Sequence, residues 1–126
     1  MNAVRYFTPR EANQTLPLVK RIVQDIRGTG RQLLRLAAEL GPDAEEDPTF
    51  KKLRNELHDL GYELERLGCS YKDPNFELGL VDFPSVIDGE EVLLCWRSDE
   101  PSVMFYHGFE DGYMGRKPIP DTYLDE

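Results

Sequence analysis

The sequence predicts an α+β fold, in which a long antiparallel helical hairpin precedes a small antiparallel β-sheet. Apolar residues recur at steps of three and four through residues 9–68, which is the spacing of helices that pack against each other. Short stretches of alternating polarity, separated by turn residues, follow in residues 69–116. We expect a single domain, residues 1–126, that ends in a loose tail at residues 117–126.

The first predicted helix is marked at both ends. Thr8 suits the N-cap, Pro9 the first helical position, and Glu11 the position whose carboxylate reaches back to the cap. Gly41 and Pro42 predict the end of this helix. Its apolar seam consists of Leu16, Val19, Val23, Ile26, Leu33, Ala37 and Leu40.

The second predicted helix is equally well marked. Asp47 is its expected cap, Pro48 occupies its first position, and Gly68 ends it. Its seam consists of Phe50, Leu53, Leu57, Leu60, Leu64 and Leu67. Because the connecting loop is short, we expect the two helices to be antiparallel neighbours.

The two helices differ in length, and this difference predicts where the sheet packs. The first helix has about 32 residues and the second about 21, so the first extends roughly 16 Å further at ~1.5 Å per residue. This extension is the N-terminal part, where Ala12, Leu16 and Val19 need another cover. The chain that follows Gly68 emerges at the same end, so we expect the sheet to pack there. Gly28 and Gly30, in the middle of the helix, indicate a weak point or a close approach by another helix.

The second half of the chain is predicted to form short strands. The expected strands are residues 69–72, 78–83, 86–87, 91–96 and 102–107. Asp88 and Gly89 form a two-residue hairpin signal between two of them. Pro84 is expected to limit the pairing of its strand, because proline lacks a backbone N–H.

The negative charge of the chain is concentrated in the predicted sheet region. Residues 1–68 hold 11 Lys and Arg against 11 Asp and Glu, whereas residues 69–126 hold 4 against 13, which accounts for the whole net charge of −9. Nucleic-acid binding depends on many basic residues, so we expect no nucleic-acid partner.

The sequence also predicts a cytoplasmic protein with no membrane segment. No apolar stretch approaches the ~20 residues that a membrane-spanning helix needs. The N-terminal residues lack the apolar core of a secretory signal. Cys69 and Cys95 form no metal-binding or redox motif with each other, and we expect two reduced, buried thiols.

A possible metal site is the most specific chemical hypothesis in the sequence. His107 ends a predicted strand, and Glu110 follows it in a short loop. Asp82 ends another strand of the same sheet, and the predicted packing brings Glu11 close to it. Imidazole and carboxylate groups suit zinc, iron or manganese. The same pattern is compatible with a structural role, in which Asp82 pairs with an arginine and Glu11 only caps its helix.

A second hypothesis is a site for a small anionic ligand that needs no metal. Arg97 and Arg116 are the basic residues nearest the aromatic strands, and Trp96 could line a pocket beside them. Cross-strand aromatic packing is the alternative interpretation of Trp96.

Four segments resemble one known family, the bacterial domain of unknown function numbered 2203. They are FTPREANQTLPLV at residues 7–19, GLVDFP at 79–84, VLLCWR at 92–97 and YHGFEDGYMGR at 106–116. The resemblance covers nearly the whole chain in the same order. It implies homology, and it implies no established activity.

Three classes of function follow from the sequence. The first is a protein that binds a divalent metal, and whether such a protein would be an enzyme is left open. The second is an interaction or structural module, a homodimer formed through the helical hairpin, because two helices bury only part of their apolar stripes. The third is a binder of a small anionic ligand.

Overall fold

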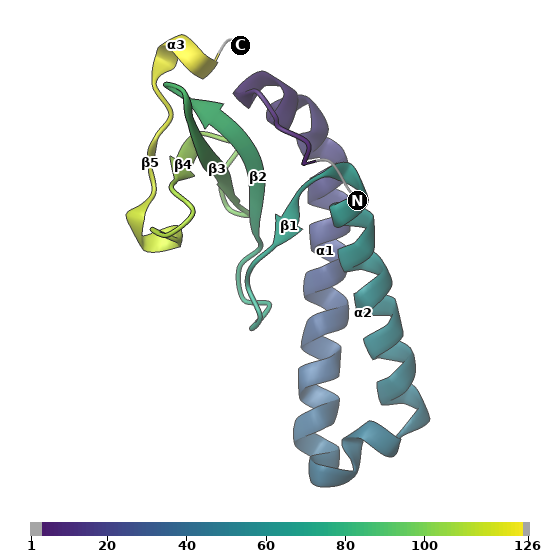
Figure 1. Cartoon of the computed structure of the whole chain (residues 1–126). Helices are drawn as coiled ribbons and strands as arrows, with labels where there is room; N and C mark the ends of the chain where they lie inside the picture. The colour runs from purple at the N-terminus through teal and green to yellow at the C-terminus, as the bar shows by residue number, and fades with distance from the viewer. Residues whose placement is uncertain (1–3, 125–126) are drawn as a thin grey trace.

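The computed structural model describes residues 4–124 and confirms the α+β fold (Figure 1). Two long helices, α1 (Pro9–Leu40) and α2 (Pro48–Leu67), form an antiparallel hairpin that is closed by the short 3-10 helix η1 (Gly41–Glu46). A five-stranded antiparallel sheet follows. Its strands are β1 (Ser70–Tyr71), β2 (Leu80–Ile87), β3 (Glu90–Arg97), β4 (Phe105–His107) and β5 (Lys117–Pro118). Among the described residues, no helix is long and apolar enough to cross a membrane.

The start of α1 is fixed by the predicted capping box. The Thr8 hydroxyl accepts a hydrogen bond from the backbone N–H of Glu11 at 3.1 Å, and the Glu11 carboxylate accepts one from the N–H of Thr8 at 2.9 Å. Two backbone donors that a helix start leaves without partners are thereby satisfied. Pro17 lies inside α1 and does not end it.

Both ends of α2 also follow the sequence signals. The Asp47 carboxylate accepts a hydrogen bond from the N–H of Phe50 at 3.0 Å, which caps the helix. Gly68 ends it with a φ of 103°, a left-handed conformation that glycine adopts without a steric cost. Local capping chemistry therefore determines the length of the hairpin.

The strands pair in the order in which they occur along the chain. Asp88 and Gly89, with φ angles of 54° and 78°, form the tight turn between β2 and β3. The register then sets Asp82 opposite Cys95 and Leu93 opposite His107. The strands expected at 78–83 and 86–87 are one continuous strand, β2. β1 pairs with β2 only at Val81 and Asp82, before Pro84, whose carbonyl accepts a hydrogen bond from the N–H of Phe7 at 2.7 Å.

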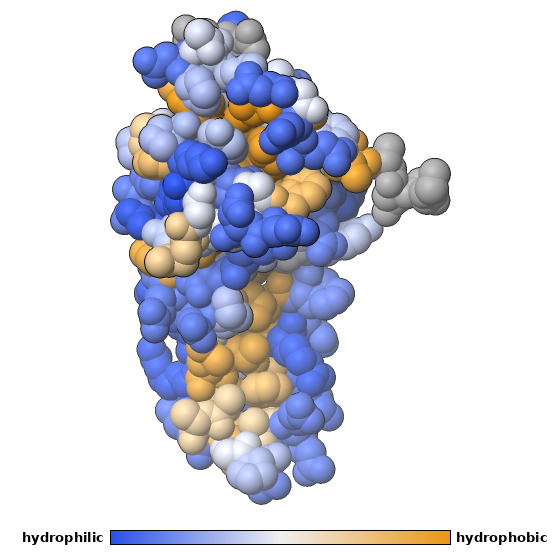
Figure 2. All heavy atoms as spheres, turned by 60° about the vertical axis from the view of Figure 1, so that its left-hand side comes forward, coloured by the Kyte–Doolittle hydropathy of each residue, from blue (hydrophilic) through white to orange (hydrophobic). Residues whose placement is uncertain are grey.

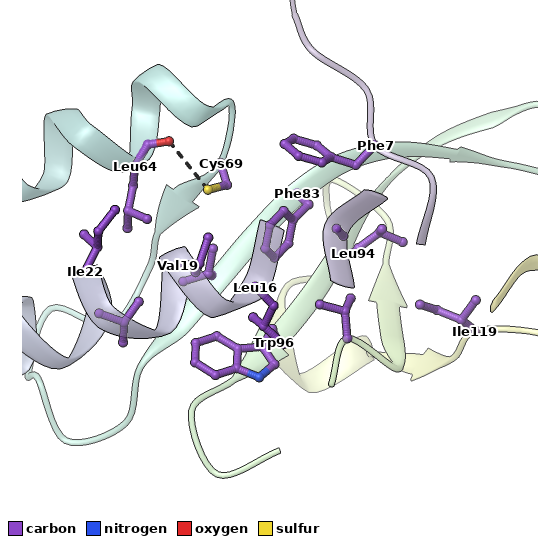
Figure 3. Close-up of a cluster of buried hydrophobic side chains, with 14 of the residues drawn as sticks. Phe7, Leu16, Val19, Ile22, Leu64, Cys69, Phe83, Leu94, Trp96 and Ile119 are labelled. Carbon is purple, nitrogen blue, oxygen red and sulfur yellow. Dashed lines mark hydrogen bonds between the residues drawn. The ribbon is translucent and has the colours of Figure 1, made fainter. Parts of the chain in front are cut away.

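The sheet covers the N-terminal part of α1, as the lengths of the helices predicted. Ala12, Leu16 and Val19 are at most 3% exposed. They pack with aromatic side chains from the sheet and from the segment before α1 (Figure 3). Phe7 meets Phe83 edge to face, with ring centroids 5.2 Å apart. The core is therefore formed between one face of the sheet and the half of α1 that α2 cannot cover.

The sheet leaves the other half of the hairpin without a cover. Figure 2 shows an apolar stripe that continues along the hairpin below the sheet. Along α1, the buried hydrophobic side chains end at Ile26. The helix continues to Leu40, and none of its residues after Gly30 is fully buried.

Gly30 makes room for a loop and not for a helix. A Cβ atom on Gly30 would lie 2.4 Å from the ring of Phe76, so only glycine lets this ring rest on α1. Phe76 also stacks on Tyr71, with centroids 6.0 Å apart. Arg31 donates a hydrogen bond to the carbonyl of Phe76 at 3.0 Å and thereby fixes the loop on the helix.

The segment after residue 116 is not the loose tail that the sequence predicted. β5 pairs with β4, and the N–H of Ile119 donates to the carbonyl of Met104 at 2.8 Å. The side chain of Ile119 is only 3% exposed, and the short helix α3 (Asp121–Leu124) follows. The prediction failed because Ile119 is a single apolar residue between two prolines, and a single residue gives no periodic signal. Its burial is nevertheless enough to anchor the chain. Residues 125–126 lie outside the described part.

Candidate metal centre

Asp82, Cys95 and His107 lie together on the face of the sheet that points away from α1. Side chains alternate between the two faces of a strand, so Val81 and Phe83 enter the helix-facing core while Asp82 points to the other side. All three residues are nevertheless buried, at 5%, 1% and 3% exposure. The chain after β4 covers this face, as shown by the guanidinium of Arg116, which lies 4.0 Å from the ring of Phe105.

The three side chains offer one nitrogen, one sulfur and one oxygen that converge on a common point. These atoms all lie within 4.8 Å of one another. The Nε2 atom of His107 is 3.3 Å from Oδ1 of Asp82. Within residues 4–124, this is the only group of three or more His, Cys, Asp and Glu side chains that meets at such distances.

The ring of His107 is oriented by its other nitrogen. Nδ1 lies 2.8 Å from the carbonyl oxygen of Gly108. A carbonyl only accepts hydrogen bonds, so Nδ1 carries the proton. In a neutral imidazole Nε2 then presents its lone pair to the carboxylate of Asp82. Two acceptors that face each other need a cation or a proton between them.

Burial favours the neutral forms of Asp82 and Cys95. The pKa of Asp82 is raised mainly because the carboxyl group is buried away from water. Interactions with His107 and Lys72 lower this pKa and partly offset the effect of burial. Burial, followed by the negative charge of Asp82, raises the pKa of the Cys95 thiol to about 12. Burial therefore favours the protonated forms of Asp82 and Cys95, and a cation bound between them would replace these protons.

A cavity connects this cluster to the surface. It has a volume of about 320 Å³, and the three side chains form part of its wall. Lys72 and Phe109, both exposed, and Tyr113, half-buried, also line it. An ion or a small molecule can therefore reach the cluster without unfolding the sheet.

Comparison with known proteins identifies the family of this chain. A family model described as "Uncharacterized conserved protein (DUF2203)" matches residues 5–119. The chain belongs to the DUF2203 family. No curated protein and no solved structure matches the chain. The matched range contains the whole cluster, and the DUF2203 description assigns it no activity.

The structure of this DUF2203 chain brings together two of the four predicted metal ligands. His107 and Asp82 meet, whereas Glu110 and Glu11 do not belong to the cluster. Glu110 is exposed in the turn after β4. Glu11 is held in the capping box of α1, where its hydrogen bonds with Thr8 lower the pKa of its carboxyl group. The expectation that these two acids complete the set is therefore corrected.

The residues predicted to bind an anion are already engaged with other groups. Arg116 donates to both carboxylate oxygens of Glu100 at 2.7 Å, and the two side chains are only 11% and 9% exposed. Arg97 donates to Asp99 at 2.5 Å and to the hydroxyl of Tyr113.

Trp96 belongs to the opposite side of the sheet from the cluster. It is 1% exposed within the helix-facing core, and its indole N–H donates to the carbonyl of Glu100 at 2.9 Å. Arg97 and Arg116 therefore bond to other groups of this DUF2203 chain, and Trp96 lies in its helix-facing core.

Cys95 is the member of the cluster that sequence reasoning missed. It lies within an apolar strand, where a buried thiol normally belongs to the core. Alternation along β3 would have separated it from Leu94 and Trp96, which share the opposite face. Its position opposite Asp82 depends on the register of the β2–β3 hairpin, which the turn at Asp88 fixes.

Proposed function

We propose that this protein binds a divalent transition-metal ion, zinc or iron, through Asp82, Cys95 and His107. The cytoplasmic location expected from the sequence suits such a site, because Cys95 must remain reduced to bind an ion. Both cysteines are free thiols. The proposal concerns binding, and it leaves open whether a reaction follows.

The orientation of His107 is the observation that carries this proposal. Metal-binding histidines commonly donate their second ring N–H to a carbonyl or carboxylate, which turns the other nitrogen toward the ion. The bond from Nδ1 of His107 to the carbonyl of Gly108 has this form. The lone pair of Nε2 then points to a carboxylate oxygen at 3.3 Å.

The distance between His107 and Asp82 also suits a metal better than it suits a strong ion pair. Bonds of ~2.0–2.3 Å to zinc at tetrahedral angles place neighbouring ligand atoms about 3.3–3.7 Å apart. A charge-assisted hydrogen bond between imidazolium and carboxylate would be about 2.7–2.9 Å long. The separation of 3.3 Å between His107 and Asp82 falls in the first range.

The ligand types narrow the choice of ion. The sequence alone left zinc, iron and manganese open, since it suggested only imidazole and carboxylates. The sulfur of Cys95 disfavours manganese, because a thiolate is a soft ligand and manganese prefers oxygen. Among the remaining ions, a mixed nitrogen, oxygen and sulfur set is usual for zinc.

Three protein ligands leave a tetrahedral ion with one open position. The adjacent cavity of about 320 Å³ can supply water or a small ligand at that position. Lys72 lines the same cavity, so its ammonium group would favour an anionic oxygen ligand. The anionic ligand expected from the sequence therefore fits better beside the ion than at Arg97 and Arg116.

Metal content is the direct test of this proposal. Protein purified without an affinity tag should contain about one zinc or iron ion per chain by elemental analysis. Asp82→Asn and His107→Gln, which preserve size, should lose this ion while helicity is retained. Glu110→Gln and Glu11→Gln serve as matched controls, and both should keep it. Equal metal content in all five proteins would reject the site.

Cobalt(II) provides a spectroscopic test of the sulfur ligand. The wild-type protein with cobalt should show the near-ultraviolet charge-transfer absorption of a cobalt–thiolate bond. Cys95→Ser should abolish this band, and Cys69→Ser should not, although Cys69 is an equally buried free thiol. A band that persists in Cys95→Ser would show that the metal binds elsewhere.

The alternative is that Asp82 and His107 form a purely structural pair without a metal. In that case a chelator would leave the melting temperature unchanged, and added zinc would not raise it. A bound ion instead stabilises the folded state. At zinc concentrations above the dissociation constant, this stabilisation grows with the logarithm of the zinc concentration. The dependence of melting temperature on zinc concentration therefore separates the two interpretations.

A further inference from the structure

The loop between β4 and β5 forms part of the wall of the cavity beside the cluster. Phe109, Gly112 and Tyr113 of this loop line the cavity. The loop belongs to YHGFEDGYMGR, one of the segments by which the sequence resembles its family. It supplies none of the three metal ligands, so its two aromatic side chains have a position at the cavity without a role in holding the ion.

Asp111 fixes the shape of this loop. Its carboxylate accepts a hydrogen bond from the N–H of Gly108 at 3.3 Å, and its own N–H donates to the carbonyl of Gly108 at 3.2 Å. A Cβ atom on Gly115 would lie 2.7 Å from the Cβ atom of Asp111, so the two ends of the loop approach each other only with glycine there. The loop therefore holds Phe109 and Tyr113 in defined positions.

The cavity offers two hydrogen-bond donors that the fold does not use. The hydroxyl of Tyr113 accepts a hydrogen bond from Arg97, and its own proton has no acceptor among the described residues. Within residues 4–124, the ammonium group of Lys72 forms no ion pair. Its charge nevertheless reaches the cluster, because it partly offsets the effect of burial on the pKa of Asp82. Both donors suit an anion that binds through oxygen.

The charges around the cavity favour an anion with a single charge. A divalent ion in the cluster is balanced by the carboxylate of Asp82 and the thiolate of Cys95, since His107 binds as a neutral ring. Lys72 then adds one positive charge to the cavity. Residues 69–126 carry a net charge of −9, so the surrounding field opposes anions with two or more charges.

The remaining wall of the cavity is apolar. Leu80 and Leu93 are half-buried and line it together with Phe109, whose side chain is 57% exposed. An exposed aromatic ring at a cavity offers a contact surface for an apolar group. The volume of about 320 Å³ lies near the lower end of the ~300–1,000 Å³ that is usual for ligand pockets. A small molecule with both a charged and an apolar part therefore matches this wall.

We propose that the cavity binds a small organic monocarboxylate with an apolar body, such as an aromatic acid with one ring. This inference rests on the proposed function, because the carboxylate occupies the open position of the metal ion. Lys72 and Tyr113 donate hydrogen bonds to the carboxylate. The apolar body packs against Leu80, Leu93 and Phe109.

Titration of the cobalt(II) protein with small probes tests the class of ligand. Benzoate should change the visible absorption of the bound cobalt, because its carboxylate enters the coordination sphere. Benzamide, which has a similar shape and no charge, should cause no change at the same concentration. Acetate lacks the ring and should bind roughly tenfold more weakly than benzoate. Inorganic phosphate should also bind more weakly than benzoate.

Substitution of Phe109 tests the contact with the apolar body. Phe109→Ala should weaken benzoate binding roughly fivefold and leave acetate binding unchanged, because only benzoate has a ring to lose contact with. Met114→Ala is the matched control: Met114 belongs to the same loop, is 91% exposed and is not among the residues that line the cavity. Equal weakening of benzoate and acetate by Phe109→Ala would overturn the apolar contact.

Substitution of the two donors tests the contacts with the carboxylate. Tyr113→Phe keeps the ring and removes the hydroxyl, so it should weaken benzoate and acetate alike, by about fivefold. Lys72→Met should weaken both by about threefold, since Lys72 is exposed and exposed charges interact weakly. Lys51→Met, at an exposed position of α2, is the control and should change neither. Unchanged binding in both Tyr113→Phe and Lys72→Met would overturn these contacts.

The same samples distinguish failure of this inference from failure of the metal site. If the cobalt–thiolate band is present but benzoate leaves the visible absorption unchanged, the ligand class is wrong and the metal site stands. Tighter binding of phosphate than of benzoate, or equal binding of benzoate and benzamide, would also overturn the ligand class alone. If the cobalt–thiolate band is missing, the metal site fails and the inference fails with it.

Discussion

The two faces of the β-sheet are built by the same strands, and they differ in what they bury. The face toward α1 buries Val81, Phe83, Leu94 and Trp96, a set of apolar side chains from adjacent strands. The opposite face buries Asp82, Cys95 and His107, which are polar or reactive. Packing explains the first set, because each buried apolar side chain stabilises the fold. The second set costs free energy to bury, so its presence needs a function or a partner.

Adjacent residues on one strand carry this difference. Phe83 meets Phe7 in the core, whereas Asp82 faces His107 on the other side. The two faces should therefore respond differently to mutation. Changes on the helix-facing side should lower stability, and changes on the opposite side should remove binding.

Phe83→Ala should have the largest effect on stability. The ring is fully buried, and its removal leaves a cavity beside α1. We expect a loss of about 3–5 kcal/mol in the free energy of unfolding, measured by urea denaturation. The folded fraction of this variant should still bind as much metal per chain as the wild-type protein. A loss of metal from the folded fraction would contradict the separation of the two faces.

Glu100→Gln should have the next largest effect, through the segment that covers the cluster. It leaves the guanidinium of Arg116 buried without its charged partner. We expect a loss of about 3 kcal/mol in the free energy of unfolding. Asp99→Asn is the control, because its partner Arg97 lies in a more exposed pair. Equal losses in the two variants would show that burial of the pair is unimportant.

Alkaline pH should destabilise the protein through a thiol on each face. Burial raises the pKa of Cys69, in the helix-facing core, and of Cys95, in the cluster, from 9.0 to about 12. Above pH 9 the unfolded chain releases protons that the folded chain keeps, so stability should fall from pH 9 and continue to fall until about pH 12.

Single substitutions should separate the two thiols. Cys69→Ala and Cys95→Ala should each reduce the slope of stability against pH, measured by thermal unfolding in a series of buffers. Saturating zinc should remove the contribution of Cys95 alone, because a metal-bound sulfur has already lost its proton. A slope from Cys95 that zinc leaves unchanged would argue against a metal–sulfur bond.

Asp82→Asn should have the smallest effect on stability. In metal-free protein, burial favours the neutral carboxyl group, which asparagine resembles in size and polarity. We therefore expect a change of about 1 kcal/mol or less in the free energy of unfolding. This loss is much smaller than the one expected for Phe83→Ala, one position away. A large loss of stability in Asp82→Asn would indicate that the cluster is structural.

Signals that act over a few residues made most of the fold predictable. The capping box at Thr8, the cap at Asp47 and the turn at Asp88 each depend on residues that lie within four positions of one another. The packing of the sheet on α1 followed from helix lengths and needed no knowledge of contacts. Ile119 was missed because a single anchoring residue has no period.

The site was only partly predictable, because it depends on strand register. His107 and Asp82 were identified from their positions at predicted strand ends. Glu110 was included because it is close to His107 in sequence, but its side chain is exposed. Cys95 was omitted because it lies within an apolar strand, where a buried thiol normally belongs to the core. It reaches the cluster only through two successive strand pairings.

The sequence alone determined the helical hairpin, the tight turn of the sheet and the separation of charge between the two halves. These features depend on local backbone preferences and on composition, which need no folded chain. Only the tertiary structure decided which polar side chains meet and which apolar surface stays bare. Both depend on how strands align and on how far the sheet extends along α1, and these are properties of packed elements rather than of neighbouring residues.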